Sequence, residues 1–494
     1  MLKTIIAREF LNNILNLRFM IGLVLCVIIT IACIMILTYD YQQEMKDYNI
    51  RINLQDEITD NHAKADRHRF LGMLGPQKPP ERFRSLIIGI QDNEDSGFFD
   101  YNPLPILFHP LDFLFIVTII MSLLAMLFSH DAIAGERQNG TLRLVISNSI
   151  SRTTVLLGKF IGGTTSLLIP FILALLVGAL YISVNSAIQW DSSAWKELAL
   201  LTAASITFIT LFYLLGLMVS TFSRYSSTSI LNCLFLWILL ILVIPNVCPY
   251  ISAQLYRIPS IKQTERQTRE IDLHGQETAS KLMKESVKKM KKQYGSLFSE
   301  FESMEFGGIG GFFLGIDAGP EHEKVARERA DADPEFKAMM KAFRKEEEKA
   351  QQELIRIGKE ADMLREALSR KAALQTKLAK NLACISPFAN FVYVARDLTG
   401  TGLRSLDYFE QTKGEYKQQL GSYADKKIDD MRKKEQAIGE ESPLDVSDRP
   451  RFVFREEPLK DKVNEVLPYW GILVLFNVVF FVAAFAGFMR YDVR

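Results

Sequence analysis

The stretch HDAIAGERQNGTLRLVISNSISRTTVLLGK, residues 130–159, decides the fold of this chain. It is polar and contains Gly135 and Gly140, and it lies between two apolar segments, 110–129 and 160–184. A helix of about 20 apolar residues is long enough to cross the hydrocarbon core of a bilayer. The stretch is therefore predicted to be a loop that joins two membrane spans.

Composition extends this prediction to the whole chain. Hydrophobic residues make up 48% of the 494 residues, 33 residues are Phe, and only 23% are charged. Most of the charged residues lie between 251 and 464, whereas the apolar blocks have few. The formal net charge of +1 gives no basic field that would favour nucleic acid as a partner. We expect an all-α membrane protein, in contact with membrane lipid, with a large hydrophilic insert.

Hydropathy predicts six transmembrane helices and one helix that lies along the membrane. Apolar and polar residues at helical spacing in 1–18 predict a cytoplasmic amphipathic surface helix. The first span is too long, and lacks the cleavage site, for a removed signal peptide. Pro170 predicts a kink or a break in the third span. The predicted spans are 19–38, 110–129, 160–184, 198–222, 229–250 and 467–489.

The charges of the short loops predict the orientation, because Lys and Arg favour the cytoplasmic side. With both termini in the cytoplasm, the following residues all lie on that side: Lys3, Arg8, Arg18, Arg137, Arg143, Arg152, Lys159, Arg224, Arg490 and Arg494. The short loop 185–193, placed outside, contains only Asp191 as a charged residue. The inserts 39–109 and 251–464 are then both external.

The external inserts are predicted to differ. Proline-rich 39–109 predicts a small irregular domain whose one strand-like run is SLIIGI, 85–90. In 251–464, apolar residues in steps of three and four predict two long helices paired as an antiparallel hairpin. The apolar run 385–402 is too short to span and is expected at the outer membrane face. A third, charged helix is predicted at about 415–437.

The tip of the predicted hairpin, residues 306–320, is rich in glycine and carries Phe312, Phe313 and Leu314. These three apolar residues are candidate contacts for an extracytoplasmic accessory protein or for the substrate. The alternative is that the hairpin is a rigid cap or spacer. The apolar residues along the two helices, here called the seam, are expected to pack against each other rather than to bind a partner.

Catalytic and metal-binding patterns are missing from the sequence. No GxxxxGK[ST] phosphate loop occurs, and the six histidines show no HxxxH or HExxH spacing. A cluster of His62 and His68 with Asp60 and Asp66 is the weak alternative, against the simpler interpretation of a solvated loop. Four of the five cysteines lie in or beside spans, which does not suit a disulfide framework. We expect no catalytic residue, no metal and no cofactor in this chain.

Residues 130–159 are the strongest candidate for a functional surface. A short amphipathic segment bounded by glycines, with Glu136, Arg137 and Arg143, suits a surface that docks into a groove of another protein. The alternative is an ordinary helical turn with solvated charges. Spacing alone leaves both interpretations open.

The residues of this stretch resemble a known family. ERQNGTLRL at 136–144, SNSISR at 147–152 and LLGK at 156–159 resemble the cytoplasmic loop of type 2 ABC exporter permeases. SPFAN at 386–390 and LTGTG at 398–402 are similar to elements before the last span of the same family. Ser149 departs from the family, which usually has Pro there, and the 251–464 insert is much longer than usual.

The resemblance implies that the chain is a permease subunit of the bacterial cytoplasmic membrane. Separate cytoplasmic ATPase subunits would bind ATP and Mg²⁺, and a second permease, identical or paralogous, would complete a dimer. Few charges in the spans favour a lipid-like or hydrophobic substrate. The alternative is an ATPase-coupled scaffold that transmits force and moves no substrate through a pore. Carried over, the residues that couple to the ATPase are Glu136, Arg137, Gly140, Thr141, Leu142, Arg143, Arg152 and Lys159.

Overall fold

The computed structural model describes residues 2–65, 76–89, 111–147, 151–185, 188, 190–258, 261–303, 333–438 and 448–490. Regular structure in these ranges is helical. The chain divides into two compact units, one formed by Met1–Cys248 with Asn381–Arg494 and the other by Pro249–Lys380. The second of these units is therefore shorter than the predicted insert of 251–464, because residues 381–464 belong to the first unit.

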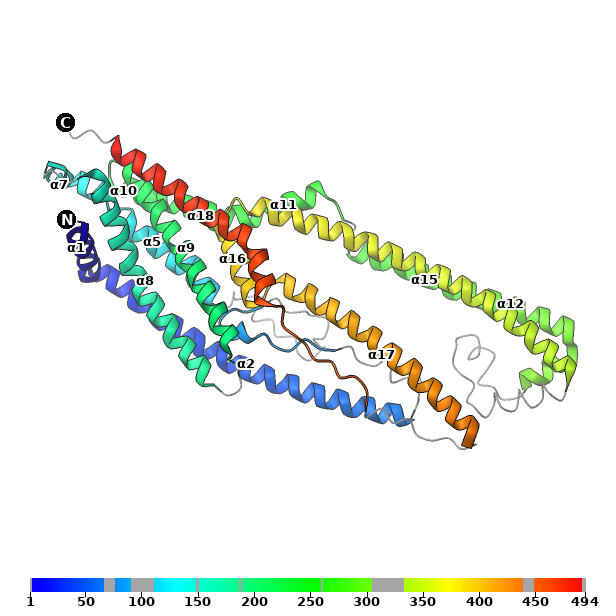
Figure 1. Ribbon diagram of the computed structural model, residues 1–494. Coiled ribbons are helices and arrows are strands. Elements are labelled where there is room, and N and C mark those ends of the chain that lie inside the picture. Colours follow the sequence, from blue (N-terminus) through cyan, green and yellow to red (C-terminus); the bar gives the residue numbers. More distant parts are fainter. Residues whose placement is uncertain are drawn as a thin grey trace. The chain divides into compact units, whose positions relative to one another are not determined.

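The described residues contain six helices long and apolar enough to cross a membrane, as predicted. They cover Met20–Ile58, Phe113–Gln138, Arg152–Val184, Ser192–Phe222, Ser226–Leu255 and Leu459–Met489. Figure 1 shows three of them side by side: α8 (Arg152–Val184), α9 (Ser192–Phe222) and α18 (Leu459–Met489). Buried apolar side chains of the first unit form its core, including Phe208, Phe212 and Phe391.

The first span is part of a much longer helix. α2 runs from Leu17 to Ala65, so the predicted irregular domain is wrong for residues 39–65. No Pro or Gly interrupts this segment, and Tyr41 and Met45 continue the apolar face of the span against the core. The helix α1 (Leu2–Leu15) precedes it, within the predicted range 1–18, and its amphipathic character stays a prediction. The position of α1 on a membrane surface stays a prediction.

The described residues of the strand-like run, 85–89, do not form a strand. Residues Arg82–Ser85 form the 3₁₀ helix η1, and Leu86 and Ile87 follow it as fully buried residues. The Ile87 amide donates to the Phe83 carbonyl at 2.8 Å, and the Phe113 amide donates to the Leu86 carbonyl at 2.9 Å. Burial in a helical core explains the apolar run, which sequence alone assigned to a strand.

Among the described residues, two spans contain π-helical turns, and three contain a proline inside a helix, at Pro170, Pro249 and Pro468. The second span is built from α4 (Phe113–Phe115), η3 (Ile116–Met121) and α5 (Ser122–Ser129). The fifth is built from α10 (Ser226–Trp237), η4 (Ile238–Val243) and α11 (Ile244–Leu255). Trp237 Nε1 donates to Ser122 Oγ at 2.9 Å and joins the two spans beside their π-helical turns. α8 continues through Pro170, so the alternative of a broken third span is wrong.

The second unit contains an antiparallel pair of long helical segments, α12 (Ile261–Ser303), which is kinked at Gly295, and α15 (Pro334–Ala383). Met290 and Phe298 of α12 are buried against Phe336, Met339 and Phe343 of α15. Lys289 pairs with Glu346 at 2.6 Å beside this seam. The predicted tip residues Phe312, Phe313 and Leu314 lie outside the described residues.

After the helix pair, the chain returns to the first unit. α16 (Pro387–Thr399) is largely buried and packs against α9 and α18. α17 (Leu403–Ile438) begins about a turn after α16 and is longer than the predicted 415–437. Residues 448–458, here called the strap, run along α17, where Phe452 and Phe454 meet the ring of Phe409 edge-on. Arg449 of the strap pairs with Asp56 of α2 at 2.6 Å.

Candidate functional site

The described part of the 130–159 stretch contains two short helices before α8 begins at Arg152. α6 (Ala134–Gln138) and α7 (Thr141–Ser147) are separated by a turn at Gly140, whose φ is +71°. Residues with a side chain seldom adopt this conformation, so glycine is required for the turn. Ser149, the departure from the family pattern, lies outside the described residues.

α6 is anchored on the turn between α9 and α10. The Ser220 hydroxyl accepts hydrogen bonds from the amides of Ile133 at 3.0 Å and Ala134 at 2.9 Å, which satisfies donors at the start of α6. Arg137 donates to the carbonyl of Ser223 at 2.9 Å and to that of Thr221 at 3.1 Å. A movement of α6 must therefore either take the end of α9 with it or break these hydrogen bonds.

Lys159 joins three elements through a buried ion cluster. Its ammonium, with a side chain only 4% exposed, lies 2.8 Å from Glu9 of α1 and 2.7 Å from Glu136 of α6. A buried ammonium must be paired because its desolvation costs several kcal/mol. The Tyr213 hydroxyl of α9 donates to the Lys159 carbonyl at 3.2 Å. The sequence identified Glu136 and Lys159, but it did not predict that Glu9 completes the cluster.

Two glycines of α8 allow α1 to approach closely enough for this cluster. A Cβ at Gly158 would lie 2.5 Å from a methyl carbon of Ile5, and a Cβ at Gly162 would lie 2.9 Å from the carbonyl oxygen of Ile6. Both distances are shorter than van der Waals contact, so a side chain at either position would push the helices apart. Figure 1 shows α1 lying against the beginning of α8.

α7 has one buried face and one exposed face. Leu142 is fully buried in an apolar cluster with Ile133, Leu156 and Phe488. Thr141, Arg143 and Leu144 are exposed, and the Leu144 side chain is 67% exposed. The exposed face of α7 combines a cation with a large apolar side chain, a combination common at protein interfaces.

Arg152 anchors the return of the chain to the membrane. It donates to the carbonyl of Met489 at the end of α18 at 2.6 Å. Arg152 attaches the beginning of α8 to α18, and Lys159 attaches it to α1 and α6. Of the eight residues proposed for coupling, Glu136, Arg137, Leu142, Arg152 and Lys159 hold the stretch in place, whereas Thr141 and Arg143 face outward.

Comparison with known proteins gives the family. The family described as "ABC-2 family transporter protein" matches residues 3–493. The chain belongs to the ABC-2 transporter family. It is also similar to the probable ABC transporter permease protein NosY of Stutzerimonas stutzeri and of Pseudomonas aeruginosa, with 45% identity over 47 residues in each case. The similar segment covers 10% of this chain and 17% of each relative, so the match spans less than a fifth of their length.

Membership agrees with the multi-pass membrane architecture and implies association with ATPase subunits. Permease subunits of the ABC-2 family are normally non-catalytic, and separate ATPases hydrolyse ATP. In the described residues of this ABC-2 transporter, no group of three or more His, Cys, Asp or Glu side chains could hold a metal ion. The weak alternative cluster cannot be placed, because His68 lies outside the described residues.

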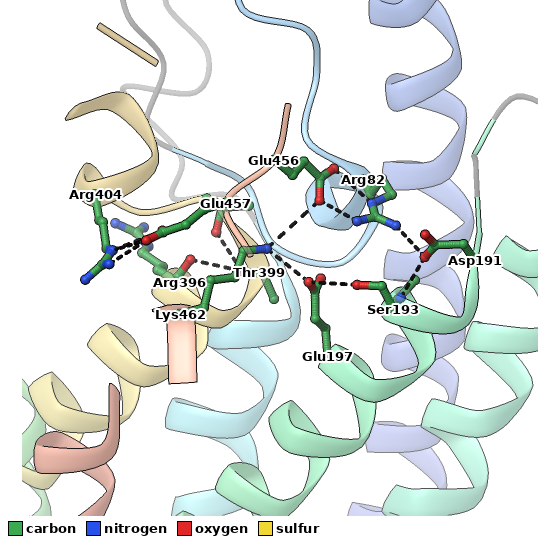
Figure 2. A network of polar contacts seen from close by, with 12 residues as sticks. Arg82, Asp191, Ser193, Glu197, Arg396, Thr399, Arg404, Glu456, Glu457 and Lys462 are labelled. Atoms are coloured by element: carbon green, nitrogen blue, oxygen red, sulfur yellow. Dashed lines mark hydrogen bonds and ion pairs between the residues drawn. The ribbon is translucent and has the colours of Figure 1, made fainter. Parts of the chain in front are cut away.

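A second buried lysine lies at the opposite end of the ABC-2 bundle, and the sequence analysis did not identify it. Lys462 of α18 pairs with Glu197 of α9 at 3.1 Å, and the two side chains are only 4% and 2% exposed. Figure 2 shows Lys462 between Glu197 and Glu456, which is 4.0 Å from the ammonium. The predicted spans began at 198 and 467, which left both residues just outside them. Ionisable residues at span ends were the available signal.

Arginines extend this second cluster along the strap. Arg82 of η1 donates to Glu456 and pairs with Asp191 at 2.6 Å. Burial lowers the pKa of the Arg82 guanidinium, but the hydrogen bond and charge of Glu456 outweigh this effect and hold it above its usual value. Arg404 of α17 donates from Nε to Glu457 at 2.9 Å and pairs with Glu465 at 2.7 Å. The strap is therefore fastened to η1, α17 and α18.

Proposed function

We propose that this chain is the permease subunit of an ATP-driven exporter of the bacterial cytoplasmic membrane, with both termini in the cytoplasm. The cations of the short loops support this orientation, since they fall on the side of the 130–159 stretch. Cytoplasmic ATPase subunits would bind ATP and Mg²⁺, and a second copy or a paralogue would complete the dimer. The apolar spans favour a lipid-like or hydrophobic substrate.

The exposed face of α7 docks the ATPase in this proposal. Arg143 supplies a cation and Leu144 an apolar anchor, while buried Leu142 fixes the helix to the bundle. Nucleotide-driven movement of the ATPase can change the permease only if a contact differs between the two states. α7 and α6, joined by the turn at Gly140, are the parts of the permease that would receive this movement.

The observation that carries the proposal is the position of Lys159. Its ammonium is bound by carboxylates on α1 and α6 while its backbone is part of α8. Separating these elements would leave a buried charge unpaired, which is costly. The ion cluster therefore makes α6 and the beginning of the third span move together, and it includes the N-terminal helix in the same movement.

A charge reversal on the outward face tests docking. Arg143→Glu combined with Leu144→Asp should abolish co-purification of the ATPase and ATPase activity stimulated by the permease. Arg490→Glu, an exposed cation at the same end of the bundle, is the matched control and should retain both. Unchanged capture of the ATPase by the Arg143 and Leu144 variant would refute the proposed surface.

A second substitution tests transmission separately from docking. Glu136→Lys places a second ammonium beside Lys159 and should uncouple transport from ATP hydrolysis. Glu136→Gln removes the charge without reversing it and should have a smaller effect. Normal transport-coupled turnover in Glu136→Lys would exclude the ion cluster as the transmitting element.

A force-transmitting scaffold is the second candidate. The observation in its favour is that α2 continues from its span to Ala65 and is held near its far end by Arg449 of the strap. A cysteine placed at Leu231, an exposed residue of α10, would separate the two functions. A pore predicts ATP-dependent labelling by a membrane-impermeant thiol reagent, whereas a scaffold predicts no change in labelling.

The helix pair of the second unit is proposed to be extracytoplasmic and to contact an accessory protein through Phe312, Phe313 and Leu314. Two long packed helices with a fixed seam could hold such a contact at a set position. Deletion of residues 306–318 should abolish partner capture and leave ATPase binding intact. If the deletion variant still captures the partner, the helix pair is better explained as a cap or spacer.

A further inference from the structure

A groove at the junction of α9 and α10 is lined by both polar and apolar residues. It has a volume of about 400 Å³. Ser223, Arg224, Thr228 and Asn232 supply its polar part, while Phe222 and Phe235 contribute apolar walls. This volume is within the range of small-molecule sites, about 300–1,000 Å³.

The polar residues follow one another along a single line of the chain. Arg224, Thr228 and Asn232 are spaced by four residues, and Thr228 and Asn232 therefore share one face of α10. Phe235 continues this face three residues later. Moving into the span, the groove thus presents a guanidinium, a hydroxyl, an amide and then apolar carbon. A phospholipid has the matching order of phosphate, glycerol esters and acyl chains.

Arg224 is available to an anion. Its side chain is exposed, its guanidinium lies 5.8 Å from the centre of the Tyr225 ring, and it forms no ion pair with the described residues. A guanidinium can donate two parallel hydrogen bonds to a phosphate. Its position before the first residue of α10 is where a headgroup would lie if the span begins there.

Asn232 adds an independent observation. It lies in the second turn of an apolar span, is exposed, and forms no hydrogen bond with the described residues. An amide without a partner in a bilayer costs free energy, and polar residues within spans commonly have a partner or a function. An ester oxygen of a lipid could accept a hydrogen bond from this amide.

We propose that this groove binds the headgroup of an anionic phospholipid from the leaflet on the side of the 130–159 stretch. A second permease is the competing occupant, but a twofold contact through this face would bring two Arg224 side chains toward each other without a compensating carboxylate in the groove. Positive charge without an acidic neighbour favours the anionic lipid. The inference does not depend on the direction of transport.

The groove is continuous with the coupling stretch. Arg137 of α6 donates to the carbonyl of Ser223, and the Ser226 amide donates to Gln138 Oε1 at 3.2 Å. Ser223 itself lines the groove. A bound headgroup would therefore contact the same turn that anchors α6, so lipid occupancy would affect the element that we propose receives movement from the ATPase.

Native mass spectrometry of the purified full chain in detergent tests the inference. Wild-type protein is titrated with dioleoyl phosphatidylglycerol or dioleoyl phosphatidylcholine, and the retained lipid is counted. We expect preferential retention of phosphatidylglycerol, reduced about fivefold by Arg224→Gln, as expected for one basic residue near an anionic surface. Asn232→Leu should weaken retention of both lipids, and Arg490→Gln, the control cation, should change neither.

Three results would overturn the inference. Equal retention of the two lipids by wild-type protein would show that no anionic headgroup is selected. Equal losses in Arg224→Gln and Arg490→Gln would show that the effect is general surface charge. A fall in the dimer fraction of Arg224→Gln or Asn232→Leu in the same spectra, with lipid retention unchanged, would assign the groove to a second permease instead.

Discussion

Two lysines with the same small exposure, Lys159 and Lys462, lie at opposite ends of the bundle and are held differently. Lys159 has two carboxylates at 2.8 and 2.7 Å, whose side chains are 21% and 29% exposed. Lys462 has one carboxylate at 3.1 Å that is only 2% exposed, and a second at 4.0 Å that is 38% exposed. The first cluster can still reach water through its carboxylates, whereas the second encloses Glu197.

The comparison separates transmission from attachment. Lys159 brings together α1, α6 and α8, each of which contributes one charged group, so a change at one element reaches the others. Lys462 and Glu197 instead join α18 to α9, and Glu456 lies only six residues before Lys462 in the same chain. We therefore expect loss of Lys462 to affect stability most and loss of Lys159 to affect coupling most.

The largest effect on stability is expected from Lys462→Met. It leaves the Glu197 carboxylate buried without its counter-ion and should lower the free energy of unfolding by about 3–5 kcal/mol. Chemical unfolding in a fixed detergent measures this change. Adding Glu197→Gln should recover most of the loss, because the double variant no longer buries a net charge. An additive double variant would contradict the pairing.

Lys159→Met should destabilise less, by about 2 kcal/mol, because both carboxylates can be partly hydrated once the ammonium is gone. Its main effect should be uncoupling, measured as ATP hydrolysis that no longer depends on the state of the permease. A stability loss as large as that of Lys462→Met, with coupling intact, would reverse the comparison.

The sequence predicted the six spans and the paired long helices because apolar residues repeat at helical spacing over whole segments. The length of α2 was missed because residues 39–65 are mostly polar and were grouped with the proline-rich segment after them, although no Pro or Gly interrupts them. Glu9 and Glu197 were missed for a different reason. Each is an ordinary charged residue until the fold brings a lysine from 150 or 265 residues away.

Close packing of α1 on α8 should also contribute to the stability of the bundle at the end that contains Lys159. Gly162→Ala adds a Cβ 2.9 Å from the Ile6 carbonyl oxygen and should cost about 1–2 kcal/mol through overpacking. Gly471→Ala in α18, where nothing lies within 4 Å, is the matched control and should be neutral or slightly stabilising. Thermal unfolding monitored by circular dichroism compares the two. Equal effects would show that α1 is not closely packed.

The smallest effect on stability is expected for Asp191, which pairs with Arg82 at the edge of the cluster around Lys462. The Ala194 amide, followed by Arg82, holds the pKa of Asp191 below its usual value, so the folded-state pKa lies below the unfolded one. Stability from this carboxylate is present above the unfolded pKa of about 4 and is lost as pH falls through the folded pKa. Asp191→Ala should cost about 1 kcal/mol as a lost helix cap at pH 7 and much less at pH 3. A constant loss across this range would exclude the carboxylate as the cause.

The central claim is that the outward face of α7 binds an ATPase and that Lys159 passes its movement to the spans. Affinity capture of the full chain from native membranes, followed by identification of the bound proteins, tests it most directly. We predict that wild-type protein retains an ATPase with a phosphate-binding loop, that Arg143→Glu with Leu144→Asp loses it, and that Lys159→Met retains it without coupled hydrolysis. Capture of the same ATPase by the Arg143 and Leu144 variant at the wild-type level would contradict the claim.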